Sequence, residues 1–412
     1  MAERPAERGL LMMTRPDLFP ANHGAAVAIE RLAWGLSRCY GPVYLVTDQR
    51  QRYYAYVDGE RRTLWYPWRV RLSLPRRAVR HWLELRGLPP SESFLYGPLV
   101  DWSAARRARY VARAHGVRAY QAAFPAYALP CLRCRDELGG PVVLVEHNVE
   151  YQRICEQLPD VAPRGERLLR ELELGVCRAV DGVVAVSEPD RAKLLADGVP
   201  DAKMHVIPHG VDLGSYDAAQ PCDVRREYGI AADAAVLVYH GTFTYGPNLE
   251  AMQVMAAEIL PALRERGVRA TVLAIGRAPP AEPLDPDIIF TGPVPSVAPY
   301  LLAADLAVVP LRQGGGTRMK VLDYFAARLP VVSTAKGIEG IPARDGVEFV
   351  LADEAEAFAA AVQRLLRHRD EARAMGARGR AFVEPLDWLA IARRHADLLD
   401  QLAGGAPKRG GR

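Results

Sequence analysis

The stretch 308–340 constrains the fold of this chain more than any other. It opens with an apolar, β-prone run at 308–311 and continues through three consecutive glycines at 314–316. Apolar residues at helical spacing follow, before Pro330 and a second β-prone run at 331–333. This order predicts strand, glycine loop, helix and strand, which is the repeating unit of a parallel α/β sheet.

The glycine loop also predicts a binding site for a diphosphate. Gly314, Gly315 and Gly316 let backbone N–H groups approach a ligand closely, and the start of the following helix adds partial positive charge. Arg318 and Lys320 add two full positive charges. A tight turn between strand and helix, with two solvated cations, is the alternative explanation of the same residues.

Two further residues beside the glycine loop have predicted roles. Thr317 can cap the helix that follows the loop. Asp323 lies one to two turns into that helix, where its carboxylate can accept hydrogen bonds from sugar hydroxyls.

The composition indicates a globular protein with reduced cysteines. Half of the 412 residues are hydrophobic and a quarter are charged, which supplies core for two or three domains. The net charge of +4 is too small to indicate a nucleic-acid partner. The six cysteines are scattered, and the CxxC at 131–134 has no second pair beside it, so neither a disulfide framework nor a zinc site is expected.

We expect a cytoplasmic protein. The apolar run at 10–13 is too short for a signal peptide, and no later run is long enough to span a bilayer. The segment 404–412 is rich in glycine and arginine and is predicted to be a disordered tail.

The first half of the chain alternates between strand and helix patterns. Buried strands are predicted at 9–14, 43–47, 117–122, 141–146, 182–187 and 205–207. The first turn lacks GxGxxG and no acidic residue closes the second strand, so a nicotinamide dinucleotide site is disfavoured. His23 and Gly24 fall where an open α/β sheet presents ligand-facing loops, although a plain surface loop explains them equally well.

Polar, titratable residues follow the predicted strand at 141–146. His147 can donate a hydrogen bond to a sugar oxygen, and Glu150 can accept one from a sugar hydroxyl. The alternative is a simple helix start that is capped by Asn148.

Residues 61–85 combine four aromatic residues with seven arginines. Such a mixture suits an anionic surface, such as lipid headgroups or a lipid-diphosphate acceptor, and would bring the protein to the inner face of a membrane. The alternative is an ordinary amphipathic element with solvated arginines.

A cluster of proline and glycine at 208–212 predicts a linker between two domains. Beyond the linker, strand and helix patterns alternate again from 235 onward. The last pattern is an amphipathic helix at 386–402, after Pro385.

Several motifs together resemble the GT-B glycosyltransferases, and within them the retaining branch called family 4. The strongest is GGGTRMKVLDYFAARLPVVST at 314–334, where many relatives read GxGTRxKxLEAMAxGxPVVxT. Four shorter segments agree with it: HNVE at 147–150, AVS at 185–187, IPHGVD at 207–212 and GTFTYGPN at 241–248.

The resemblance implies an α/β fold of two Rossmann-like domains that face each other across a cleft. Residues 1–207 would form the acceptor domain and 208–384 the donor domain. A helix at 385–403 would then return to pack on the first domain.

The resemblance also implies roles for the candidate site residues, with no metal and no cofactor. His147 would position the donor sugar, and Arg318 and Lys320 would hold the diphosphate. The remaining residues divide into a nucleotide-sugar group (Gly241, Gly314, Gly315, Gly316, Thr317, Asp323 and Glu339) and an acceptor group (His23, Gly24, Asn148 and Glu150).

Two departures from the family pattern concern the donor site. Many relatives carry a Glu-x7-Glu pair, but here Asp323 replaces the second Glu and Gly315 stands at the first. Relatives also place cations after the first donor-domain strand, whereas 242–248 contains none. We therefore expect Arg318 and Lys320 to take over the role of these missing cations in binding the diphosphate.

The resemblance implies a retaining transferase that moves a sugar from a nucleotide-diphosphate sugar to a glycan, glycolipid or lipid-linked acceptor in polysaccharide biosynthesis. A sugar-nucleotide epimerase and an inactive nucleotide-binding scaffold are the alternatives.

Overall fold

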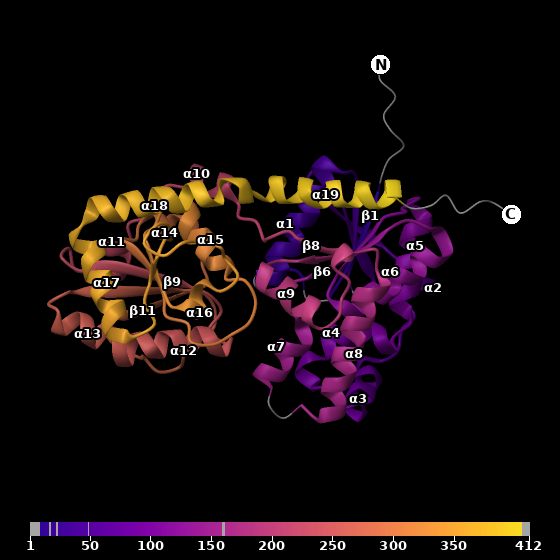
Figure 1. Ribbon diagram of the computed structural model, residues 1–412, viewed down its shortest axis with the longest axis horizontal. Helices are drawn as coiled ribbons and strands as arrows, with labels where there is room; N and C mark the ends of the chain where they lie inside the picture. Colours follow the sequence, from indigo (N-terminus) through magenta and orange to yellow (C-terminus); the bar gives the residue numbers. More distant parts are fainter. Residues whose placement is uncertain (1–8, 16–17, 22–23, 48, 159–160, 406–412) are drawn as a thin grey trace, which may run out of the picture. The chain divides into compact units, whose positions relative to one another are not determined.

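The computed structural model describes residues 9–15, 18–21, 24–47, 49–158 and 161–405 (Figure 1). The chain divides into two compact units. Unit 1 comprises Met1–His209 and Trp388–Arg412, and unit 2 comprises Gly210–Asp387. The boundaries predicted after residues 207 and 384 lie within three residues of these divisions.

Unit 1 is built on an eight-stranded sheet in the order β4-β3-β2-β1-β5-β6-β7-β8. The six strands from β2 to β8 in that order are parallel, whereas β3 and β4 are antiparallel at one edge. The strands are β1 (Leu10–Thr14), β2 (Val43–Thr47), β3 (Arg52–Val57), β4 (Glu60–Trp65), β5 (Tyr120–Ala123), β6 (Val142–Glu146), β7 (Gly182–Ala185) and β8 (Met204–Val206).

Helices cover the sheet of unit 1. They are α1 (Gly24–Cys39), α2 (Trp68–Arg71), α3 (Arg76–Leu85), α4 (Ser93–Val100), α5 (Ser103–Ala114), α6 (Pro125–Leu138), α7 (Glu150–Gln157), α8 (Pro163–Ala179), α9 (Glu188–Ala196) and α19 (Trp388–Gly405). Both cysteines of the CxxC lie buried in α6, where loss of hydration raises the pKa of each thiol, so neither is poised to react.

Unit 2 is built on a six-stranded parallel sheet in the order β11-β10-β9-β12-β13-β14. The strands are β9 (Ala235–His240), β10 (Ala270–Ile275), β11 (Ile288–Gly292), β12 (Leu306–Val309), β13 (Val331–Ser333) and β14 (Val350–Leu351). In Figure 1 they lie between α18 on one side and α12 and α13 on the other. The helices are α10 (Leu213–Ala218), α11 (Val224–Tyr228), α12 (Gly246–Val254), α13 (Leu260–Glu265), α14 (Ala298–Leu302), α15 (Met319–Ala326), α16 (Ala335–Ile338), α17 (Ala355–Arg367) and α18 (Arg369–Val383).

The antiparallel hairpin of β3 and β4 was not predicted. Four consecutive residues of β3 are buried, so the strand lacks the alternation that usually marks a sheet edge. A signal was nevertheless present, because Asp58 and Gly59 join the strands and both have positive φ, as a tight hairpin turn requires.

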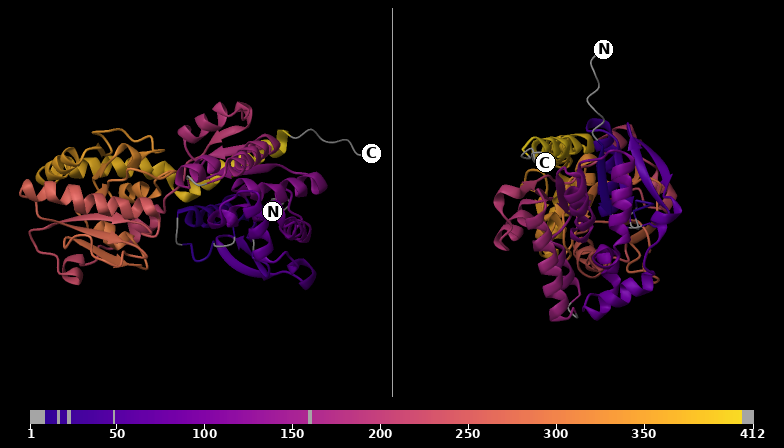
Figure 2. Two further views of the ribbon diagram at one scale, coloured as in Figure 1. Left: turned by 90° about the horizontal axis from the view of Figure 1, so that it is seen from below. Right: turned by 90° about the vertical axis from the view of Figure 1, so that its right-hand side faces the viewer.

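The last helix returns to unit 1, which confirms that prediction. α19 packs along α1, and Figure 2 shows it against unit 1 from two further sides. Arg394 donates a hydrogen bond to the carbonyl of Val206 at 3.0 Å. The helix extends to Gly405, so the first two residues of the predicted tail are helical, and 406–412 lie outside the described residues.

The contact between α1 and α19 depends on a glycine. A Cβ at Gly35 would lie 2.6 Å from the Cβ of Ala392 and 3.1 Å from the carbonyl oxygen of Trp388. Only a residue without a side chain lets the two helices approach this closely.

We expect Gly35→Ala to lower the free energy of unfolding of unit 1 by about 1–3 kcal/mol, because the added methyl group overpacks the helix contact. Gly175→Ala is the matched control. Position 175 also lies in a helix, but a Cβ there meets nothing within 4 Å, so helix propensity alone should make it neutral or stabilising. Thermal unfolding of both variants measures the difference, and equal melting temperatures would contradict the packing argument.

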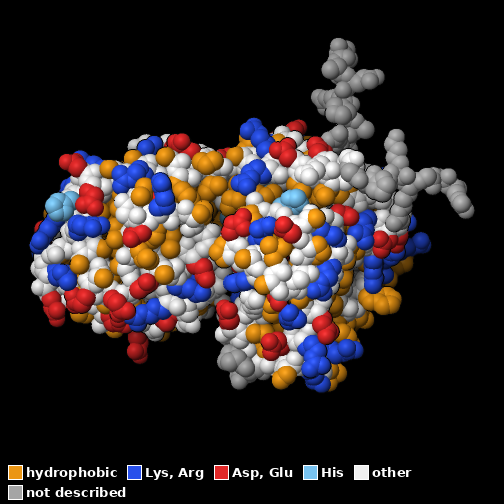
Figure 3. Space-filling model, viewed as in Figure 1, with side chains coloured by type: hydrophobic (Ala, Val, Ile, Leu, Met, Phe, Trp, Pro, Cys, Tyr) orange, Lys and Arg blue, Asp and Glu red, His pale blue; other side chains and the backbone are white. Residues whose placement is uncertain are grey.

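Charge is spread unevenly over the molecule. In Figure 3, Lys and Arg side chains gather over α3, whereas both signs are mixed over unit 2. Residues 61–86 hold eight arginines and a single carboxylate, Glu84.

Within the described part of the chain, no helix is long and apolar enough to cross a membrane.

Candidate functional site

The glycine loop joins β12 to α15 at the carboxyl edge of the sheet of unit 2. Gly314 and Gly316 have φ of +109° and +79°, which residues with a side chain rarely adopt. The backbone conformation of the loop therefore requires glycine at these two positions. The predicted cap is wrong, because α15 begins at Met319 and Arg318 precedes it without a side-chain cap. The hydroxyl of Thr317 is buried and has no hydrogen-bond partner among the described residues.

Arg318 organises the glycine loop from within. Its guanidinium donates to the carbonyls of Gly314, Gly315 and Gly316 at 2.8, 2.6 and 2.6 Å and to that of Lys336 at 3.2 Å. It also lies 3.5 Å from the carboxylate of Glu339, and its side chain is buried. These contacts use the donors of the guanidinium fork, so a diphosphate bound by Arg318 would have to displace one of them.

Lys320 is held differently, on the first turn of α15. Its ammonium donates to the hydroxyl of Tyr239 at 2.5 Å and to the amide oxygen of Asn248 at 2.7 Å, and it lies 3.8 Å from the centre of the Tyr239 ring. Among the described residues, no carboxylate forms an ion pair with it. Loss of hydration, followed by repulsion from Arg318, lowers the pKa of the Lys320 ammonium well below its usual value.

Asp323 joins three elements of unit 2. One carboxylate oxygen accepts from the Tyr216 hydroxyl at 2.8 Å, and the other lies 3.2 Å from Nε2 of His240. His240 ends β9, and its ring packs edge-on against Tyr324. The carboxylate is partly exposed and retains lone pairs for a further donor, so the predicted ribose contact would add to these bonds.

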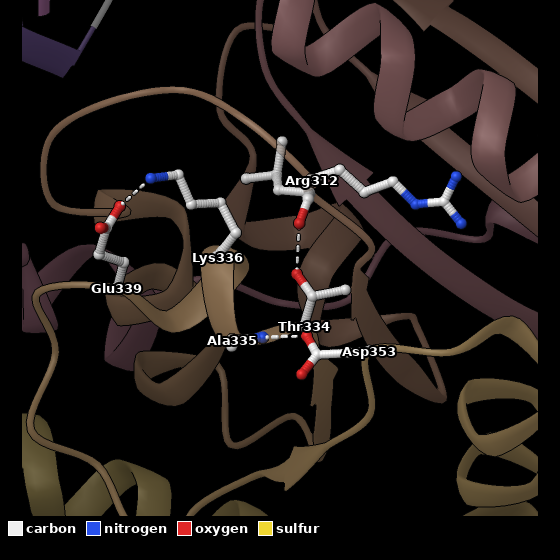
Figure 4. Close-up of a pocket in the computed structure, with 7 residues that line it drawn as sticks. Arg312, Thr334, Ala335, Lys336, Glu339 and Asp353 are labelled. Atoms are coloured by element: carbon white, nitrogen blue, oxygen red, sulfur yellow. Dashed lines mark hydrogen bonds and ion pairs between the residues drawn. The ribbon is translucent and has the colours of Figure 1, made fainter.

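A pocket of about 440 Å³ lies beside the glycine loop, between the ends of β12 and β13 (Figure 4). Lys336 and Glu339 stand on one side of it and form an ion pair of 2.8 Å. Asp353 accepts from the backbone N–H of Ala335 at 2.7 Å on the opposite wall. Among the predicted site residues that the structure describes, Glu339 alone lines this pocket. The remaining lining residues are Leu311, Arg312, Thr334, Ala335, Lys336 and Asp353.

The residues predicted from HNVE lie in unit 1, where β6 meets α7. His147 is buried, with its ring stacked 5.3 Å from that of His209. The carboxylate of Glu150 is also buried and accepts from Asn148 at 3.0 Å and from Arg153 at 2.8 Å. The predicted contact of Glu150 with a sugar hydroxyl would compete with these bonds.

Gly24 and His23 are the two other residues predicted on the acceptor side. Gly24 is exposed and begins α1. His23 lies outside the described residues.

Unit 2 thus brings together the glycine loop, Lys320 and Asp323, and adds residues that sequence reasoning missed. Gly241 lies beside Asn248, whose amide nitrogen donates to the Thr242 carbonyl at 2.9 Å and so closes the loop after β9. Tyr239 and Asn248 hold Lys320, a role that neither the family resemblance of 241–248 nor its lack of cations predicts. The neighbouring Pro247-Asn248 pair was the available signal for a structured loop.

Two family models match the chain. Residues 22–215 match the model described as Glycosyltransferase Family 4, and residues 234–368 match that described as Glycosyl transferases group 1. Together they cover most of the chain and fall on the two units in turn.

The curated relatives are similar at modest identity. A D-inositol 3-phosphate glycosyltransferase of Geodermatophilus obscurus is 30% identical over 57% of this chain and 56% of its own length. One from Thermobispora bispora is 30% identical over 64% of this chain and 66% of its own length. This chain therefore spans less than two thirds of either. A GDP-mannose-dependent alpha-(1-6)-phosphatidylinositol monomannoside mannosyltransferase of Mycobacterium tuberculosis is 26% identical over 78% of this chain and 83% of its own length.

Solved structures share the fold over nearly the whole chain. Sucrose-phosphate synthase from Thermosynechococcus elongatus superposes with a TM-score of 0.70 at 18% identity, over 97% of this chain and all of its own. Anabaena Alr3699/HepE, solved in complex with UDP, superposes with a TM-score of 0.67 at 14% identity, over 96% of this chain and all of its own.

The two sheets, one parallel and one parallel except at its β3–β4 edge, the returning helix and these structural neighbours define a GT-B fold, as predicted. The matches of both units to glycosyltransferase models place the chain more narrowly. Its first half matches the family 4 model and its second half the group 1 model, which makes the chain similar to the GT-B glycosyltransferases of family 4.

Proposed function

We propose that this protein is a retaining glycosyltransferase that moves a sugar from a nucleotide-diphosphate sugar to a glycan, glycolipid or lipid-linked acceptor in polysaccharide biosynthesis. The observation that carries the proposal is Lys320. Its ammonium is desolvated and has no carboxylate partner in the described part of the chain, and it stands next to a glycine loop. A diphosphate would supply the missing negative charge.

The proposed roles follow from the contacts. Lys320, the backbone of the glycine loop and the start of α15 would stabilise the charge that develops on the leaving diphosphate. Arg318 would keep the loop in shape and add to the positive potential. Asp323 would accept from the ribose, and Glu339 would contact the sugar or the phosphate.

In unit 1, His147 would position the donor sugar. A retaining transfer of this kind needs no nucleophile from the protein, because the departing phosphate can take the proton of the acceptor hydroxyl. Gly24, Asn148 and Glu150 would lie on the acceptor side.

The named substrates of relatives support the acceptor class. The mycobacterial mannosyltransferase is named for a GDP-mannose donor and a phosphatidylinositol mannoside acceptor. We propose a comparable nucleotide-sugar donor and an acceptor carried by a lipid, which this protein would reach from the cytoplasm by peripheral contact with the inner face of the membrane.

A panel of nucleotide-sugars, each tested with and without lipid-linked acceptors, checks the proposal. Release of nucleoside diphosphate that depends on an acceptor is the expected result. Interconversion of the sugar without an acceptor would indicate an epimerase. Binding without turnover across the panel would indicate a nucleotide-binding scaffold.

We expect chelation of divalent metals by EDTA to leave turnover unchanged. Lys320 and the helix start already supply the positive charge that a metal ion provides in other transferases. The measurement is the initial rate in EDTA against the rate in added magnesium or manganese. A rate that falls on chelation and returns with either metal would contradict the assignment of the diphosphate charge to Lys320.

A further inference from the structure

Large hydrophobic side chains on the surface of the described chain concentrate in one region of unit 1. Six of the eight that are well exposed fall within residues 65–102: Trp65, Trp68, Leu72, Leu74, Leu85 and Trp102. Trp68 and Trp102 are 67% and 71% exposed, and Leu72 and Leu74 are 59% and 44% exposed. Tryptophan and leucine at such exposure need an explanation, because a soluble surface seldom gathers them.

The structure brings together the segments that carry four of these side chains. Trp68 begins α2, which packs against α5, and Leu72 directly follows α2. Trp102 precedes α5 by one residue, and Arg106, one turn further along α5, donates to the carbonyl of Leu72. We call Trp68, Leu72, Leu74 and Trp102 the Trp–Leu surface.

Arginines hold this surface in place and surround it. Arg50 donates to the carbonyl of Leu74 at 2.5 Å, and Arg71 donates to that of Tyr66 at 2.7 Å, so the segment that carries the leucines is tied down at both ends. The guanidinium groups of Arg69 and Arg133 lie over the rings of Trp68 and Trp102, at 5.3 and 5.4 Å from their centres.

The charge around the Trp–Leu surface indicates which kind of partner it can bind. Residues 61–86 contain eight arginines and one carboxylate, although the whole chain has a net charge of only +4. Arg61, Arg62 and Arg80 pair with Glu30, Glu60 and Glu84. Arg69 and Arg71 lie on α2, in the segment that carries Trp68 and Leu72. A fixed apolar surface with tryptophans and a rim of arginines matches the boundary between lipid headgroups and acyl chains, where indole rings and cations are both favourable. A partner protein would need an acidic rim around an apolar centre.

We infer that the Trp–Leu surface inserts into the interface of an anionic phospholipid bilayer and anchors unit 1 there. The arginines supply attraction to the headgroups, and the four apolar side chains supply insertion. The inference makes the proposed membrane location specific, but it does not depend on the proposed activity, because it can be tested without donor or acceptor.

The test uses the full chain and two kinds of vesicle, phosphatidylcholine alone and phosphatidylcholine mixed with phosphatidylglycerol. Wild type should sediment with the mixed vesicles, and lipids brominated on their acyl chains should quench its tryptophan fluorescence. Changing all four residues of the Trp–Leu surface to serine should weaken sedimentation at least tenfold and abolish the quenching. Leu351→Ser, an exposed leucine in unit 2, is the matched control and should bind like wild type.

Arg69→Gln with Arg133→Gln, at the two arginines that lie over Trp68 and Trp102, separates attraction from insertion. This pair should reduce the preference for phosphatidylglycerol, while the protein that remains bound still shows quenching. Because all six positions are exposed, circular dichroism and melting temperature should stay unchanged. Wild type that sediments with neither vesicle, or equal binding by the serine variant, would overturn the inference. Binding without quenching would also overturn it, because it would show adsorption through charge alone.

Discussion

Lys320→Met is expected to lower turnover by about thirtyfold or more, because the variant loses a charge-assisted contact worth about 2–4 kcal/mol to the leaving diphosphate. Its melting temperature should stay the same or rise. The ammonium sits desolvated with no carboxylate partner in the described part of the chain, so an apolar side chain of similar length removes an unfavourable charge from the ligand-free protein. The affinity for nucleoside diphosphate, measured by calorimetry, should fall together with turnover.

Two comparisons make this result specific. Lys193→Met removes a half-exposed lysine of unit 1 and should leave turnover unchanged. Arg318→Lys keeps the charge beside the glycine loop, but an ammonium cannot bind three loop carbonyls in the fork geometry of a guanidinium. We therefore expect Arg318→Lys to lose turnover and to expose the loop to proteases.

Other outcomes would change the assignment. Near-normal turnover of Lys320→Met would show that the diphosphate binds elsewhere. Normal turnover of Arg318→Lys, combined with loss in Arg318→Met, would show that Arg318 acts through its charge on the diphosphate.

Acidification from pH 7 to pH 5 is expected to destabilise unit 1 by about 2 kcal/mol for each of two buried histidines. Burial lowers the pKa of His209 to about 4. Burial, with repulsion from Arg394 and His209, lowers the pKa of His395 to about 3. Both side chains are buried, and Nδ1 of His395 has no hydrogen-bond partner in the described structure.

The direction follows from which state binds protons. In the unfolded chain both histidines protonate near pH 6.5, whereas the folded protein holds them neutral. The unfolded state therefore gains protons as the pH falls below 6.5. The stabilisation is complete above that pH and is lost progressively down to the folded pKa values.

Urea unfolding at several pH values measures this effect. His395→Leu should flatten the dependence between pH 7 and pH 5, because the protonating group is removed from the α19 contact. His81→Leu, at an exposed position, is the control and should keep the wild-type slope. Equal slopes for wild type and His395→Leu would exclude His395 as a source of acid sensitivity.

Much of the architecture could be predicted from the sequence because it depends on local periodicity. The apolar runs at 308–311 and 331–333 and the glycines between them are recognised from neighbouring residues. The structure places β13 at 331–333 and β12 at Leu306–Val309, two residues earlier than the first run. The positive φ of Gly314 and Gly316 is a local property as well. The return of the last helix came from the resemblance to the GT-B fold, since the sequence alone shows only an amphipathic helix.

The different contacts of Arg318 and Lys320 in the candidate site were decided by tertiary structure. Arg318 and Lys320 are two residues apart and carry the same charge, so the sequence assigns them one role. Folding separates them: Arg318 turns back onto the carbonyls of its own loop, while Lys320 meets Tyr239 and Asn248, more than seventy positions earlier in the chain. Asp323 likewise bonds to Tyr216 across 107 positions. Hydrogen bonds of side chains depend on which distant segments pack together. Hydrophobic periodicity along the chain does not predict those partners.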